Sequence, residues 1–167
     1  MIEVPLKSHK SLLIMPISYV LHQLSAHLSS YDITLYPPVN DQDLANFEGK
    51  LKSPLPDDMK ALYRFCNGFE SAEDIFRIIP LEEITIARPQ PDRNRLSFAE
   101  YMIYSDTWEI DFNQSSPNDY SISNNGARFR QLTNSFAEFL EVFLAAGVFG
   151  KGGLYAWHDD VDIQNNR

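Results

Sequence analysis

Residues 107–113 read Thr-Trp-Glu-Ile-Asp-Phe-Asn and carry the clearest strand pattern in the chain. Three large apolar residues alternate there with polar ones, and successive side chains of a β-strand point to opposite faces of its sheet. The stretch therefore predicts a strand with one buried face and one wet face. Glu109 and Asp111 fall on the wet face, so that face is predicted to be acidic.

Further strands are expected on both sides of this stretch. Residues 31–36 alternate apolar and polar side chains, and residues 75–79 form an apolar run that Pro80 stops. Residues 98–104 are rich in aromatic and β-favouring types, and Asn124-Asn125-Gly126 is a strong hairpin signal. The sequence thus predicts a run of short strands in the middle of the chain. The aromatic residues Phe98, Trp108 and Phe112 are predicted core residues.

Apolar stripes and capping residues predict helices before and after these strands. The best defined one starts at Ser135, whose spacing to Glu138 is that of a capping box. Residues 81–87 are expected to form a short helix or turn. Helices segregated from strands in this way are typical of an α+β fold with a largely antiparallel sheet. The other helices are predicted to begin near Ile17, Asn40 and Leu55.

Length and composition predict one domain. The chain has 167 residues, of which 44% are hydrophobic and 13% aromatic, which is sufficient for a sizeable core. Residues 1–167 are therefore expected to form a single domain. An N-terminal helical extension is predicted at 1–36, an exposed loop at 88–95, and a loose acidic tail at 150–167.

The net charge of −9 bears on the possible partners. An acidic protein repels phosphate backbones and is steered toward basic molecules, although the same charge also keeps a protein soluble. Cys66 is the single cysteine, so no intrachain disulfide can form. Pro16 interrupts the apolar run at 12–15, which is too short for a transmembrane helix. A cytoplasmic protein that binds neither nucleic acid nor membrane is expected.

Motifs for catalysis or metal binding are weak. His22 and His27 are five residues apart, whereas metal-binding pairs on a helix prefer four, and the acidic run after His158 lacks the pattern of a calcium loop. Lys151 lies among glycines but is not followed by the Ser or Thr of a phosphate loop. Cys66 falls on an apolar stripe and is predicted to be a core residue. No catalytic residue, cofactor or metal is predicted.

Four segments of the chain form a recognisable series. They are, in order, Leu55-Pro56-Asp57-Asp58 with Asn67-Gly68, residues 78–84, residues 98–100 with 108–112, and residues 132–140. Together they resemble the SUKH superfamily, and the resemblance, with a recognisable core, covers roughly residues 44–145. The family's often Gly/Asp-rich turn is replaced here by residues 101–104, Tyr-Met-Ile-Tyr, and its strand before the last helix is hard to recognise in residues 121–130.

This resemblance implies a sheet with helices packed on it and no shared catalytic residues. Many bacterial members look like immunity proteins that bind toxins, often nucleases, and fungal members are similar to cell-wall synthesis regulators that act as interaction hubs. The leading hypothesis is therefore a non-catalytic immunity protein, a monomer or weak dimer, that neutralises a basic toxin domain by direct binding. The alternative is a regulatory scaffold for an endogenous protein. The candidate partner-binding residues are Glu82, Glu83, Glu100, Asp106, Glu109, Asp111 and Asp119.

Overall fold

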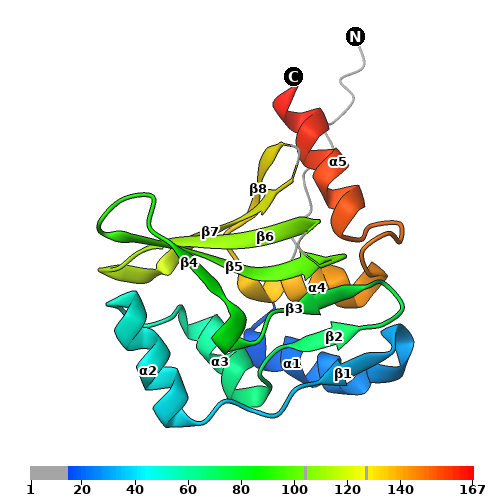
Figure 1. The fold of residues 1–167 in the computed structure, drawn as a ribbon. Coiled ribbons are helices and arrows are strands. Elements are labelled where there is room, and N and C mark those ends of the chain that lie inside the picture. Colours follow the sequence, from blue (N-terminus) through cyan, green and yellow to red (C-terminus); the bar gives the residue numbers. More distant parts are fainter. Residues whose placement is uncertain (1–14, 104, 127) are drawn as a thin grey trace.

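The computed structural model describes residues 15–103, 105–126 and 128–167 (Figure 1). In that part of the chain, helices pack on an eight-stranded antiparallel sheet, which confirms the predicted α+β class. Of the predicted N-terminal extension, residues 1–14 lie outside the described residues. The helices are α1 (Ile17–Ala26), α2 (Asp41–Leu51), α3 (Asp57–Phe65), α4 (Phe136–Ala146) and α5 (Leu154–Asn165), with single 3-10 turns at Leu28–Tyr31 and Leu81–Glu83.

The sheet has the strand order β1-β2-β3-β5-β6-β7-β8, and β4 pairs with β5 outside this path. β3 pairs with the C-terminal part of β5 and β4 with its preceding part, so both lie along the same edge of that long strand. The strands are β1 (Ile33–Leu35), β2 (Phe69–Ser71), β3 (Phe76–Ile78), β4 (Thr85–Ala87), β5 (Arg93–Tyr101), β6 (Asp106–Asn113), β7 (Ser116–Asn125) and β8 (Phe129–Thr133).

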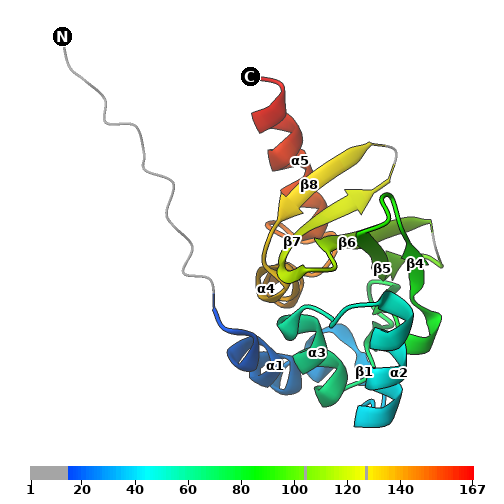
Figure 2. The same cartoon turned by 90° about the vertical axis from the view of Figure 1, so that its left-hand side faces the viewer.

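The hydrophobic core lies between one face of this sheet and the helices. Figures 1 and 2 show α1 and α4 on the same side of the sheet. Trp108 and Phe112 are fully buried, as predicted, and Phe98 packs edge-on against Phe136 and Phe139 of α4. Each large apolar side chain buried in this way contributes about 2 kcal/mol to folding. Because one face of β5 and β6 is used for this packing, only their opposite face is left to contact solvent or another molecule.

Local capping explains where α2 and α4 begin. The Asn40 side chain accepts a hydrogen bond from the Asp43 N–H at 2.8 Å, and Ser135 accepts one from the Glu138 N–H at 3.1 Å. The Glu138 carboxylate does not complete the predicted capping box. It accepts a hydrogen bond from the Thr133 hydroxyl, and that hydroxyl oxygen accepts one from the Ser135 N–H at 3.0 Å. The last strand and α4 are therefore joined through Thr133.

Residues 150–167 were predicted to be a loose acidic tail, and this prediction is wrong. Most of them form α5, in which Leu154 and His158 are buried. Asp162 on the same helix forms an ion pair with Arg130 of β8, at 2.8 Å. These contacts come from distant parts of the chain and outweigh the polar character of the segment.

Two strand boundaries also differ from prediction. β5 begins at Arg93, inside the predicted loop at 88–95, because Arg93 and Arg95 pair across the sheet with β6. In residues 81–87, one 3-10 turn is followed by β4, which completes the edge of β5.

Candidate functional site

One face of β3, β5 and β6 points away from α1 and α4 (Figures 1 and 2). The side chains of Arg77, Arg95, Glu100, Glu109 and Asp111 alternate with the core residues of these strands, and we call the face that they form the open face. Strand register sets its composition. Arg77 on β3 lies opposite Glu100 on β5, and Arg95 on β5 lies opposite Asp111 on β6. Four of the predicted binding residues meet on or beside this face: Glu83, Glu100, Glu109 and Asp111.

Arg77 connects two of these carboxylates. Its Nε donates to Glu100, and its Nη2 lies 2.7 Å from a Glu83 oxygen. Burial alone would lower the pKa of Arg77, but its bonds to Glu100 and Glu83 raise that pKa above its ordinary value. Glu100 has only 2% of its side chain exposed, and a buried carboxylate needs such a partner to remain charged. Glu100 is therefore part of the framework of the open face.

Asp111 and Glu109 are likewise held in place by neighbours. Asp111 accepts from Arg93 Nε at 2.7 Å and from Arg95 Nε at 3.0 Å. Glu109 accepts from Asn125 Nδ2 at 3.2 Å, and Arg95 Nε lies 3.9 Å from its other oxygen. The predicted acidic face is thus a mixed-charge face, because β5 brings Arg93 and Arg95 beside the carboxylates of β6.

The other three predicted residues lie away from this centre. Glu82 accepts from Asn67 Nδ2 at 2.8 Å beside α2. Asp106, at the start of β6, accepts from the Tyr155 hydroxyl of α5 at 2.6 Å. Asp119 is exposed on β7. The structure therefore divides the predicted residues between the open face and three separate places.

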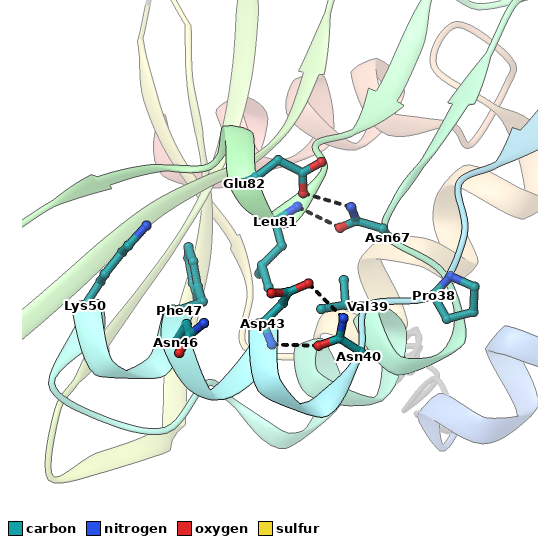
Figure 3. Close-up of a pocket in the computed structure, with 10 residues that line it drawn as sticks. All are labelled: Pro38, Val39, Asn40, Asp43, Asn46, Phe47, Lys50, Asn67, Leu81 and Glu82. Carbon is teal, nitrogen blue, oxygen red and sulfur yellow. Dashed lines mark hydrogen bonds between the residues drawn. The ribbon is translucent and has the colours of Figure 1, made fainter.

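A pocket of about 420 Å³ lies between α2 and the segments around Asn67 and Leu81 (Figure 3). Asn67 connects these two segments, because its Nδ2 donates to Glu82 and its Oδ1 accepts from the Leu81 N–H at 2.8 Å. Asp43 on the opposite wall accepts from Asn40. The hydrogen bonds drawn in Figure 3 therefore lie within each wall, and these side chains form no nucleophile–base pair.

A second pocket, of about 280 Å³, opens at the end of the open face where the β2–β3 and β5–β6 loops meet. Ile75 and Ile103 form its walls together with Phe76, and Glu70, Arg77 and Glu100 supply its polar groups. Sequence analysis did not predict this pocket. The available signal was the apolar run at 101–104, which occupies a position where a turn usually carries Gly or Asp.

A third polar cluster surrounds His158, which sequence analysis placed in the loose tail. His158 Nε2 lies 3.0 Å from the indole Nε1 of Trp108, and Nδ1 is buried without a hydrogen-bond partner in the described chain. Burial, and after it the charge of Arg130, lower the pKa of His158 to about 4, against the opposing effect of Asp106, Asp159 and Asp162. The imidazole is therefore neutral at physiological pH.

Groups suited to nucleophilic or metal chemistry are not assembled in the described chain. Cys66 is buried, as predicted, and burial raises the pKa of its thiol to about 12, so the nucleophilic thiolate is disfavoured. Among residues 15–103, 105–126 and 128–167, no group of three His, Cys, Asp or Glu side chains is placed to hold a metal ion. The helices described there are all too short or too polar to span a membrane.

The family model of SMI1/KNR4 (SUKH-1) matches residues 38–142, more than half of the chain. The chain belongs to the SMI1/KNR4 family (SUKH-1). The match extends from just before α2 into α4 and includes the open face and the two pockets described above, whereas α1 and α5 lie outside it. It confirms the resemblance read from the sequence. No curated protein shows significant similarity to the chain.

Proposed function

We propose that this SUKH-1 domain is a non-catalytic immunity protein that neutralises a toxin domain by binding it through the open face. The observation that carries the proposal is the uncovered centre of the sheet, where carboxylates are held in fixed positions by arginines. Family membership supports a protein-binding role.

Preorganisation is what makes this face suitable for tight binding. Asp111 is fixed by two arginines and Glu109 by Asn125 and Arg95, so neither carboxylate has to be ordered when a partner arrives. Binding then costs less side-chain entropy than it would on a surface of freely rotating acids. A basic partner would compete with Arg93 and Arg95 for these carboxylates, because both Asp111 oxygens already accept from an arginine.

Charge indicates the class of partner. The chain carries a net charge of −9. On and beside the open face, five carboxylates (Glu70, Glu83, Glu100, Glu109 and Asp111) outnumber three arginines (Arg77, Arg93 and Arg95). Such a surface steers a basic protein into place and selects against acidic ones. A toxin domain that acts on nucleic acid has a basic surface for its own substrate, and it would fit this requirement.

Neutralisation of a toxin in living cells tests the proposal directly. The chain is co-expressed with individual basic toxin domains, and survival is compared for wild type, Glu109→Gln and Asp111→Asn. We expect one toxin domain to be neutralised by wild type, and both variants to weaken the purified complex at least about tenfold. Asp41→Asn is the matched control, because Asp41 is 89% exposed on α2 and remote from the open face.

Two results would contradict the proposal. Equal neutralisation by wild type and both open-face variants would show that the toxin binds elsewhere. Protection against none of the toxins, combined with a stable stoichiometric complex with a protein of the same cell, would replace toxin immunity by a regulatory scaffold function.

A further inference from the structure

Two loops at the end of the open face hold apolar residues in the left-handed backbone conformation, which such residues rarely adopt. Ile75, between β2 and β3, has φ +52°, and Met102 and Ile103, after β5, have φ +48° and +49°. A positive φ is uncommon for any residue with a side chain and is a clear outlier for a β-branched one, whereas glycine adopts it freely. The Met102 N–H donates to the Ile75 carbonyl at 3.1 Å, so the two loops form one unit.

These side chains do not gain core packing in return. The exposed fractions are 56% for Ile75, 48% for Met102 and 81% for Ile103. An isoleucine that is strained and exposed stabilises neither the backbone nor the core of the isolated domain. Strained residues of this kind are concentrated at binding and switch sites, where another contact compensates for them.

The pocket between the loops is lined by apolar side chains together with charged ones. Ile75 and Ile103 line a space of about 280 Å³ that Glu70 and Glu100 also line. Arg77 lies there too, but Glu100 and Glu83 already engage its guanidinium group. Glu70 is exposed and accepts a hydrogen bond from the Tyr36 hydroxyl at 2.9 Å.

We propose that this pocket receives an arginine side chain of the protein partner. This inference rests on the proposed function and specifies which side chain of the partner binds here. The aliphatic stem lies between Ile75 and Ile103, and the guanidinium group meets Glu70. Arginine suits the site because its head is weakly hydrated and its planar donors match a carboxylate, while its stem packs on apolar surface.

A small probe tests the pocket without knowledge of the partner. The isoleucine δ1 methyl groups of the full chain are labelled, and their NMR signals are followed during titration with n-butylguanidinium. We expect saturable shifts at Ile75 and Ile103, and none at Ile163, which is 57% exposed on α5 and serves as the internal control. N-butylurea has a similar shape but no charge, and we expect it to bind at least about fivefold more weakly.

Glycine variants separate a docking role from a structural one. Because Ile75→Gly and Ile103→Gly remove strain, we expect an unchanged or raised unfolding midpoint, together with loss of the probe response at the remaining isoleucine. A lowered midpoint would show that these side chains stabilise the fold, and it would overturn the proposal. Equal binding of butylguanidinium and butylurea, or shifts that do not involve Ile75 and Ile103, would overturn it as well. If the probe fails while Glu109→Gln still weakens the toxin complex, this inference is wrong and the proposed function stands.

Discussion

Trp108 and His158 are joined by a hydrogen bond of 3.0 Å between the indole Nε1 of β6 and the imidazole Nε2 of α5. An indole N–H can only donate, so Nε2 must be the unprotonated nitrogen and the proton of the neutral ring resides on Nδ1. Both residues are buried. This bond anchors α5, which lies outside the matched family segment, to the centre of the sheet.

We expect acid to weaken the fold through His158. Its pKa in the folded chain is about 4, against an ordinary value of 6.5, because burial disfavours the charged ring. The unfolded chain takes up this proton near pH 6.5 and the folded chain only near pH 4. Stability is therefore complete above pH 6.5 and is lost as the pH falls toward 4, by about 2 kcal/mol after allowance for screening.

Urea unfolding between pH 7.5 and 4 measures this loss. The control is His158→Gln, whose side-chain oxygen can still accept from Trp108 but does not titrate in this range. The difference between the two stability curves isolates the histidine from the carboxylates. Parallel curves would show that His158 does not carry the effect.

Removal of the Arg77 guanidinium should destabilise the domain. Arg77→Met takes away a charged partner of Glu100, whose side chain is only 2% exposed, and we expect a loss of about 3 kcal/mol. Arg64→Met is the control, because Arg64 is 57% exposed and pairs with an exposed Asp41; we expect it to cost about 0.5 kcal/mol or less. Equal losses in thermal unfolding would contradict the role of the buried pair.

Two glycines with the same backbone conformation should respond differently to alanine. Gly68 and Gly152 both have φ +82°, but a Cβ on Gly68 would lie 2.3 Å from the Ile78 carbonyl oxygen, whereas a Cβ on Gly152 would meet nothing within 4 Å. We expect Gly152→Ala to cost about 1 kcal/mol from backbone strain, and Gly68→Ala at least about 2 kcal/mol more. Similar unfolding midpoints for the two variants would contradict this.

Cys66 should resist modification in the folded chain. The side chain is buried and its thiol pKa is raised to about 12, so very little thiolate is present at pH 8. We expect a thiol reagent to react at least about a hundredfold faster after the chain is unfolded in urea. Rapid labelling of the native protein, followed by mass spectrometry, would show that this part of the core opens readily.

The parts of the fold that the sequence predicts are those decided by local patterns. The alternation at 107–113 is sufficient to place the buried face of β6, and the capping residues Asn40 and Ser135 mark the starts of α2 and α4. Such features depend on near neighbours in the chain. They are therefore visible before any tertiary contact is known.

The errors concern features that depend on distant contacts. α5 was missed because His158 and Asp162 find their partners on β6 and β8. The open face was predicted to be purely acidic because strand register, which brings Arg93 and Arg95 beside Asp111, cannot be read from β6 alone. The pocket beside Ile75 depends on left-handed backbone angles, for which a run of apolar residues gives no warning.

The order of the strands along the chain has a consequence for how the domain folds. β5, β6, β7 and β8 follow one another and can pair through short turns, whereas β1 reaches β2 only after α2 and α3 have intervened, with Leu35 opposite Phe69. Closing such a long loop costs chain entropy before any contact compensates for it. We therefore expect the four-strand meander to assemble early and the β1–β2–β3 end to join it late. That end also carries Ile75, which lines the proposed arginine pocket. We therefore expect the amide hydrogens of this end to exchange first with solvent. A bound partner should slow that exchange.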